Sequence, residues 1–436
     1  MANQKRDLLD DLIDIQSDWQ ALSNPFGDIA DSLAADPSQR KVFDPADYKE
    51  KPFANSNRCL CTASGRNDVC TRCLDVCPVN AIEIHKQSVI IGDDCRKCGL
   101  CAAACPTETI STRRHMPRQV YDKIARAASA YEHCYVTCTR ALKRLPKDNE
   151  IALGCVGAIS RDLWFSLMAD YDNISVYLPV GICDRCKTTT GEEFYCDAIG
   201  TAEEWAQASL GLVADESEMT HDFTREYKRS QFMSSAVHSA ERLLTRTNPA
   251  LAGAKAVTNK ISAHASRLDQ LQRTLEGAVG AKTSNNRQRM LTQNRKLVMG
   301  ALQHDEGLAK FIDLTVPVCD ASKCTMCGDC AKVCTTRALD LDVNGHITIQ
   351  SSYCVSCGAC VKVCEDGALA MEPMDVSELI VPDPAAEELA RKKAQAKVEA
   401  QKYIEQGKKQ LSRAADVLEG LGTSDSGAND SKTSKK

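Results

Sequence analysis

The sequence has few aromatic residues and no long apolar run. Phe, Trp and Tyr together make up 5% of its 436 residues. No apolar stretch approaches the roughly 20 residues of a membrane span, and the N-terminal residues lack the apolar core of an export signal. We therefore expect a chain without a membrane span, located in the reducing cytoplasm of an anaerobic cell.

The sequence also lacks the patterns of several functional classes. A net charge of −5 is small for this length and indicates no particular partner. No recognised nucleic-acid-binding motif appears, so nucleic acid is not an expected partner. A Gly-rich dinucleotide fingerprint, a haem-attachment motif and a Ser/His/Asp arrangement are missing as well, which counts against a second substrate site.

Cysteine, by contrast, is abundant, with 24 residues. The run 95–106 has the spacing C-x2-C-x2-C-x3-C-P, which binds 4Fe–4S clusters in bacterial ferredoxins. A related run lies at 70–78, and the spacing recurs at 324–334 and 354–364. Because the fourth Cys of each run ligates the neighbouring cluster, the runs work in pairs. Two pairs predict four clusters.

This crossover assigns four ligands to each cluster. In the first pair the Cys expected three residues before Cys70 is missing, so either Cys59 or Cys61 completes the set. The sets predicted for the first pair are Cys70, Cys73 and Cys105 with Cys59 or Cys61, and Cys77, Cys95, Cys98 and Cys101. Those for the second pair are Cys324, Cys327, Cys330 and Cys364, and Cys334, Cys354, Cys357 and Cys360. The glycines after the second Cys of a run, which we expect to let the backbone approach the cluster, are Gly99, Gly328 and Gly358.

Zinc and disulfides explain these runs less well. Zinc sites such as C-x2-C…C-x2-C use four ligands with a wide gap between two pairs, whereas three of these runs have four evenly spaced cysteines. A disulfide framework is typical of small secreted domains and not of a chain of 436 residues. We therefore favour iron–sulfur clusters and keep zinc as the alternative.

The segments 70–78 and 95–106 resemble the bacterial two-cluster ferredoxins. The resemblance implies a ferredoxin-like fold and one-electron transfer, and it says nothing about the redox partner. The second module departs from the family in having Thr335 and Glu365 where Pro is usual. Since Pro is not a ligand, cluster binding should survive.

Glu365 adds negative charge beside a cluster, while Lys97 adds positive charge in the first module. We therefore expect the second module to hold the lower-potential pair.

Residues 115–215 have a different pattern, in which apolar strands alternate with helical segments. This order predicts a small α/β domain, whose ligands would sit beyond the carboxyl ends of the strands. Its cysteines follow C-x3-C, C-x-G and G-x-C-x2-C spacings that resemble the delta subunit of methyl-viologen-reducing hydrogenases. That resemblance implies a 2Fe–2S cluster and a larger, hydrogenase-like partner enzyme. It falls on Cys134, Cys138, Cys155, Cys183, Cys186 and Gly191.

Two other interpretations of these middle cysteines stay open. Cys183 and Cys186 also have the spacing of a thioredoxin-like dithiol that takes electrons as a disulfide. Alternatively, all five are inert residues buried in packing. Cys196 and Cys319 fit no pattern, and we assign them no role.

The predicted fold class is α+β and multidomain, with two ferredoxin-like double-cluster modules flanking a small α/β domain and a helical spacer. The predicted divisions are an acidic helix and linker (1–55), the first module (56–114), the α/β domain (115–215), a basic helical spacer (216–314), the second module (315–374), a C-terminal helix (375–422) and a disordered tail (423–436). The spacer either packs on its neighbours or steers an acidic redox partner.

These features predict a polyferredoxin, an electron-transfer protein that relays single electrons between redox partners in anaerobic metabolism. It would be a carrier or an oxidoreductase subunit rather than an enzyme by itself. One alternative is a reductase whose middle cysteines form a catalytic site fed by the two modules. A redox or iron sensor is a third possibility, although no DNA-binding segment supports it.

Overall fold

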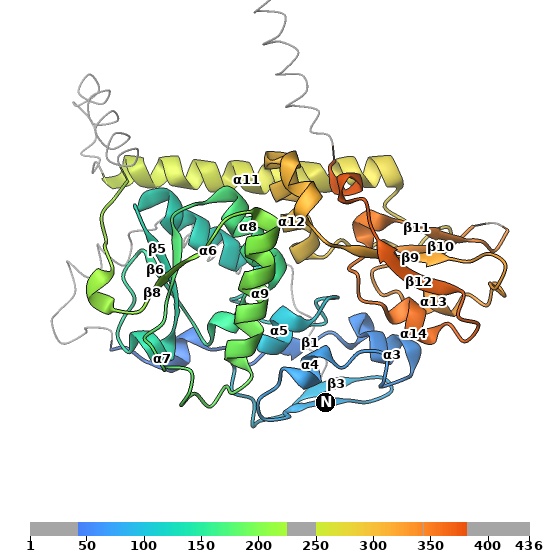
Figure 1. Ribbon diagram of the computed structural model, residues 1–436, viewed down its shortest axis with the longest axis horizontal. Coiled ribbons are helices and arrows are strands. Elements are labelled where there is room, and N and C mark those ends of the chain that lie inside the picture. The colour runs from blue at the N-terminus through green and yellow to red at the C-terminus, as the bar shows by residue number, and fades with distance from the viewer. Residues whose placement is uncertain (1–41, 225–249, 343, 382–436) are drawn as a thin grey trace, which may run out of the picture. The chain divides into compact units, whose positions relative to one another are not determined.

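The computed structural model describes residues 42–224, 250–342 and 344–381 (Figure 1). The acidic helix predicted near the N-terminus, the C-terminal helix beyond residue 381 and the tail 423–436 lie outside these residues. Contacts join these described residues into one unit. Within the described ranges, the structure contains no helix with the length and apolar character needed to span a bilayer.

This unit contains a four-stranded parallel sheet. Its strands are β5 (Cys134–Cys138), β6 (Glu150–Leu153), β7 (Ile174–Tyr177) and β8 (Gly211–Val213), in the order β6-β5-β7-β8. Every residue of β5 is buried, as expected for a central parallel strand. From β5 the chain passes first to β6 on one side and later to β7 on the other, so the strand order reverses between β5 and β7. Such a switch point is where open α/β sheets bind their ligands.

Helices connect and cover this sheet, and the predicted spacer contributes two of them. Helix α8 carries fully buried Trp164 and Phe165 and contacts both α9 and α12. Helix α11 contacts α6 and α12 (Figure 1). The spacer therefore packs on its neighbours. The helices are α6 (Pro117–Ala130), α7 (Thr139–Leu142), α8 (Arg161–Asp170), α9 (Gly191–Ala206), α11 (Ala250–Val279) and α12 (Gln293–His304).

The two cysteine-rich modules repeat one plan of two antiparallel strand pairs and short helices. In the first module, β1 (Phe53–Ala54) pairs with β4 (Ile110–Ser111) and β2 (Ile82–Ile84) with β3 (Val89–Ile91), beside α3 (Leu60–Ser64), α4 (Arg72–Asp75) and α5 (Leu100–Ala104). In the second, β9 (Thr315–Cys319) pairs with β12 (Leu369–Pro373) and β10 (Leu339–Leu341) with β11 (Ile347–Ile349), beside α13 (Asp329–Val333) and α14 (Ala359–Val363). Short 3-10 helices complete the chain: η2 (Pro45–Tyr48), η3 (Ser56–Arg58), η4 (Val156–Ala158), η5 (Glu216–Glu218), η6 (Glu306–Phe311), η7 (Ser351–Tyr353) and η8 (Val376–Leu379).

The hairpin of the second module is built differently from the two-residue type I′ turn that Asn344-Gly345 indicates. Strands β10 and β11 pair up to Leu341 and Ile347, so residues 342–346 form the connection. Of the Asn-Gly pair only Gly345 has a positive φ, of +85°, whereas a type I′ turn needs two. The hairpin is present, but the predicted turn type is wrong.

The two modules pack against each other, which the sequence left open. Leu60 and Val69 of the first module share an apolar cluster with Val333 and Val363 of the second. Helix α3 contacts α13, and the Lys362 Nζ donates to the Val69 carbonyl oxygen at 3.0 Å. Residues more than 260 positions apart in the sequence therefore form one joint core.

Candidate metal centres

The cysteine runs share a backbone conformation that wraps each loop tightly. The glycine after the second Cys has a positive φ in each of three runs, +88° at Gly99, +76° at Gly328 and +73° at Gly358. The residue before that Cys is also left-handed in each run, at Lys97, Met326 and Ser356. In two loops this turns the backbone N–H toward the first sulfur, with Lys97 N to Cys95 Sγ and Met326 N to Cys324 Sγ both 3.4 Å. Such hydrogen bonds stabilise a thiolate.

The fourth Cys of each run has its own repeated geometry. A residue with positive φ follows it three positions later, at Asn80, Glu108, Arg337 and Gly367. In three of these turns the next N–H donates back to the Cys sulfur: Ala81 to Cys77 at 3.3 Å, Thr109 to Cys105 at 3.2 Å and Ala368 to Cys364 at 3.3 Å. Three of the four left-handed residues are not Gly, so composition gave no signal for this feature.

The first set of thiols lines a small cavity in the first module. Cys59, Cys70, Cys73 and Cys105 all face it, and we call this set site I. Cys61 does not line the cavity; its Sγ lies 3.1 Å from the Cys70 carbonyl oxygen. A hydrogen bond from Cys61 lowers the pKa of Cys59 to about 6 although burial opposes the shift. The same bond, with burial, raises the pKa of Cys61. Because metals bind the thiolate, the geometry favours Cys59 as the fourth ligand.

The same crossover between runs predicts three further sets. We call them site II (Cys77, Cys95, Cys98 and Cys101), site III (Cys324, Cys327, Cys330 and Cys364) and site IV (Cys334, Cys354, Cys357 and Cys360). Burial, then repulsion from Cys98, Cys95, Cys73 and Cys77, raises the pKa of Cys101. Burial and then Cys334 and Cys354 raise the pKa of Cys357 to about 12. Buried thiolates crowded in this way repel one another unless a cationic centre lies between them.

The spacing of the thiols fits clusters better than single ions. Within the described residues, no three His, Cys, Asp or Glu side chains converge closely enough to hold one metal ion. A zinc ion draws four ligands to about 2.3 Å, whereas the four thiolates of a cubane bind four different irons and stand farther apart. All 24 cysteines lie in the described residues, and none of them forms a disulfide. The four sets therefore suit 4Fe–4S clusters.

A fifth set, site M, lies at the carboxyl ends of the parallel strands. Cys138 ends β5, Cys155 follows β6, and Cys183 and Cys186 follow β7. Because the carboxyl ends of parallel strands meet at one edge of a sheet, these cysteines lie at the same edge. Burial, followed by the charges of Cys138, Cys98 and Cys186, raises the pKa of Cys155 to about 12. A Cβ on Gly191 would come within 3.1 Å of the Cys155 sulfur. A side chain at this position would therefore push against the sulfur and displace it by a few tenths of an ångström.

Cys134 does not belong to this site, contrary to the prediction. It begins β5 while Cys138 ends it, and four residues of strand separate their Cα atoms by roughly 13 Å. Its side chain is fully buried, with Sγ 3.8 Å from the Ile124 carbonyl oxygen. Of the two unassigned cysteines, Cys196 is exposed on α9, and Cys319 lies beside Cys324 of site III.

Two features connect sites in different parts of the chain. The loop after β6 packs on the loop of site II, because a Cβ on Gly154 would lie 2.7 Å from the Lys97 carbonyl oxygen and 3.5 Å from the Cys98 Cα. Arg72 of α4 lines the cavity of site I and also a second cavity that is lined by Val355, the residue after Cys354 of site IV.

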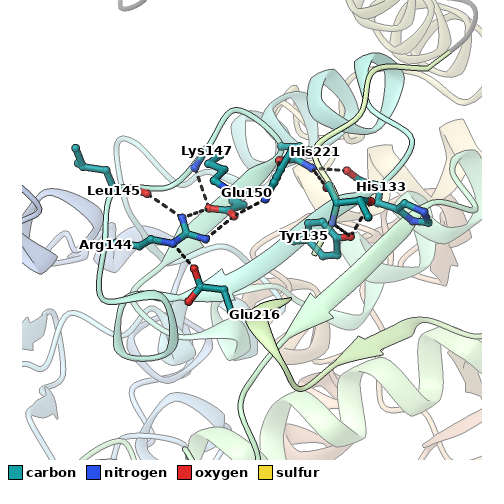
Figure 2. A network of polar contacts seen from close by, with 10 residues as sticks. His133, Tyr135, Arg144, Leu145, Lys147, Glu150, Glu216 and His221 are labelled. Atoms are coloured by element: carbon teal, nitrogen blue, oxygen red, sulfur yellow. Dashed lines mark hydrogen bonds and ion pairs between the residues drawn. The ribbon is translucent and has the colours of Figure 1, made fainter. Parts of the chain in front are cut away.

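A polar network at the other end of the sheet fixes the segment after β8 (Figure 2). The Arg144 guanidinium pairs at 2.6 Å with Glu150, whose side chain is fully buried, and at 2.6 Å with Glu216. Burial alone would raise the pKa of Glu150, but the bonds from Arg144 and from the Lys147 N–H outweigh it and lower that pKa. Glu150 begins β6, so this network lies opposite site M and serves the fold.

Cysteine runs that occur in pairs, with two cluster sites predicted for each pair, are typical of an iron–sulfur protein with dicluster domains. The family model of the 4Fe-4S dicluster domain matches residues 66–109 and 323–368. A ferredoxin of Methanothermococcus thermolithotrophicus is 35% identical over 46 residues, which is 10% of this chain and 77% of the relative. An uncharacterised ferredoxin of Methanocaldococcus jannaschii is 37% identical over 43 residues, 9% of this chain and 69% of the relative.

The chain therefore belongs to the ferredoxin family of 4Fe–4S dicluster proteins and carries two copies of the domain. Its role is iron–sulfur electron transfer, with redox proteins as partners. No solved structure gives a significant match. The two matches of the dicluster-domain model lie within the first and the second module, and site M falls outside both matched ranges.

Proposed function

We propose that this protein is a polyferredoxin that carries single electrons through five cysteine sites in the order III, IV, I, II and M. Sites I to IV would each hold a 4Fe–4S cluster, and site M a 2Fe–2S cluster. The observation that carries the proposal is the connection between sites, with Arg72 lining both the cavity of site I and the cavity that Val355 lines, and the Cys98 loop against the loop of Cys155. Separate modules would each serve one partner alone.

The protein's own groups would hold the clusters and set their potentials. The clusters supply the one-electron chemistry. Backbone donors such as the N–H of Thr109 and of Ala368 would stabilise the reduced, more negative state through hydrogen bonds to sulfur. Buried Leu60, Val69 and Ile110 around site I exclude water, which also affects the potential.

Both ends of the series reach the protein surface, where partners could dock. At site III, Cys327 is exposed, and the neighbouring side chains of Met326 and Val318 are 52% and 41% exposed. At site M, Val180 is 91% exposed three residues before Cys183. We propose that one partner exchanges electrons at site III. A larger oxidoreductase, hydrogenase-like if the resemblance of the middle domain holds, would exchange them at site M, in the reducing cytoplasm of an anaerobic cell.

The decisive experiment counts iron and acid-labile sulfide in anaerobically prepared protein. Four cubane clusters with one 2Fe–2S cluster need about 18 irons. Replacement of Cys138 by Ser should remove about two irons and the matching paramagnetic resonance signal of the reduced protein. Cys134→Ala is the matched control and should keep both, because Cys134 lies away from site M. An unchanged iron count in Cys138→Ser would contradict a cluster at site M.

The alternative, a reductase with a Cys183/Cys186 dithiol, gains no support from the geometry. A reactive dithiol needs a thiolate stabilised by its surroundings, whereas burial raises the pKa of Cys183. Turnover of a disulfide by the isolated protein with an artificial electron donor would nevertheless establish it. A carrier should be reduced under the same conditions without turnover.

A further inference from the structure

A cavity of about 300 Å³ lies where the two modules meet the middle helices. Its walls come from α4 and the end of α5 in the first module, from the starts of α8 and α12, from α9, and from Val355 in the second module. Cys105 of site I lines it, and Val355 follows Cys354 of site IV. The cavity therefore lies between two neighbouring sites of the electron series, and its size suits a small ligand.

The inner wall holds a buried cation whose hydrogen bonds are incomplete. Arg295 is only 4% exposed, and its Nη2 donates to the Cys354 carbonyl oxygen at 2.6 Å. Its Nε has no hydrogen-bond partner among the described residues. An unsatisfied buried donor on a charged group is costly. Because Arg295 also lines the cavity, a ligand there would meet a cation that the protein leaves incompletely paired.

Other donors and charges around the cavity restrict what that acceptor can be. Helix α8, with Ser160 as its N-cap, begins at the cavity, and helix N-termini favour anions. The α12 N-terminus is already occupied, since the Asn294 N–H donates to the Glu108 carboxylate at 2.9 Å. Arg72 stands exposed at the rim. A ligand in the cavity would therefore meet the guanidinium of Arg295 in the inner wall and that of Arg72 at the rim.

The acidic and apolar lining sets the ligand's charge and size. Three carboxylates, those of Asp75, Asp162 and Asp197, balance the three guanidinium groups of the lining, so the lining carries no net charge that would attract a multiply charged anion such as phosphate. One of the guanidinium groups is already paired, since the Arg161 Nε lies 3.4 Å from the Asp162 Oδ1. Ala103, Ala104 and Phe194 add apolar surface. A single carboxylate on a short apolar body matches this lining.

We propose that the cavity binds a small monocarboxylate between Arg295 and Arg72, and that this ligand lowers the reduction potential of the clusters at sites I and IV. The binding stands on the cavity alone; its effect on potential rests on the proposed function. A guanidinium near a cluster favours the reduced state, and a bound carboxylate offsets that charge. Because linkage is reciprocal, the reduced protein must bind the ligand more weakly. A tenfold difference in affinity corresponds to about 59 mV for one electron.

Calorimetric titration of the full-length, anaerobically prepared protein with acetate, propionate and phosphate tests the binding. Acetate or propionate should bind at one site and phosphate should not. Arg72→Gln should weaken binding about tenfold, the effect of one charge-assisted hydrogen bond. Arg113→Gln, which removes an exposed arginine of the first module that does not line the cavity, should leave it unchanged. No carboxylate binding, tighter phosphate binding or equal effects of the two variants would overturn the site.

A redox titration with and without saturating carboxylate then tests the coupling. Two clusters should shift to lower potential, and Arg72→Gln should need about tenfold more carboxylate for the same shift. Binding without any shift would overturn the coupling. If the iron count shows no clusters while carboxylates still bind, the proposed electron series fails and the ligand site stands, so the two failures are distinguishable.

Discussion

Replacement of Gly99 by Ala tests whether the electron series depends on contact between the first module and the middle domain. Gly99 has a φ of +88°, and a Cβ there would lie 2.7 Å from the Cβ of Ala158 in η4. Gly358 has the matching place in the second module, with φ +73°, and a Cβ there meets nothing within 4 Å. The two substitutions therefore share a backbone penalty but differ in the collision.

The expected loss of unfolding free energy follows from the backbone strain and from the collision. A left-handed residue with a Cβ costs about 1–2 kcal/mol, which is the whole expected effect of Gly358→Ala. Overpacking costs about 1–3 kcal/mol more, so Gly99→Ala should destabilise the protein by about 2–5 kcal/mol in total. Ala158 can yield only by moving η4, which carries the residues directly after Cys155 of site M. The collision should therefore also disturb site M.

The assay is the denaturant concentration at which cluster absorbance is lost under anaerobic conditions, compared between variants because unfolding with cofactor loss is not two-state. Gly99→Ala should lose its clusters at clearly lower denaturant than Gly358→Ala. It should also change the resonance signal assigned to site M. Equal midpoints for the two variants would refute the contact between the site II loop and the middle domain.

Three further predictions concern single sites. Cys59→Ala should remove the cluster of site I while Cys61→Ala keeps it, as counted by iron per chain, since only Cys59 lines that cavity; the reverse result would reassign the ligand. The pKa of Glu150 is lowered in the folded protein, so its ion pair stabilises the fold above the ordinary Glu pKa of about 4.3 and that contribution is lost as the pH falls through the lowered value. Glu150→Gln should therefore flatten the acid side of the stability profile, and an unchanged profile would contradict this role. A redox titration should place sites III and IV below sites I and II, because Glu365 adds negative charge beside site III, and the reverse order would reject that hypothesis.

The sequence predicted features set by local spacing and could not predict features set by distant contacts. The Cys runs are local, so the two modules follow from spacing alone. Cys134 was misplaced because C-x3-C was treated as a ligand pair, although those residues form a strand, in which positions four apart lie at opposite ends. Assigning the Cys-Tyr-Val-Thr-Cys run to a strand would have predicted that its two cysteines lie apart. Arg72 gave no signal, because its neighbour Cys357 is 285 positions away.

The order of the sites, together with the charge difference between the modules, gives the proposed series a direction. Site III lies at the exposed end that carries Met326 and Cys327, in the module expected to have the lower potentials. Electrons move spontaneously toward higher potential, so they would enter at site III and leave at site M. Arg72 lies at the proposed step between sites I and IV, because it lines both the cavity of site I and the cavity that Val355 also lines. A bound carboxylate at that step would make reduction of the adjacent sites less favourable and thereby slow transfer without altering either docking surface. The ligand cavity and the electron series therefore meet at the same residue, Arg72.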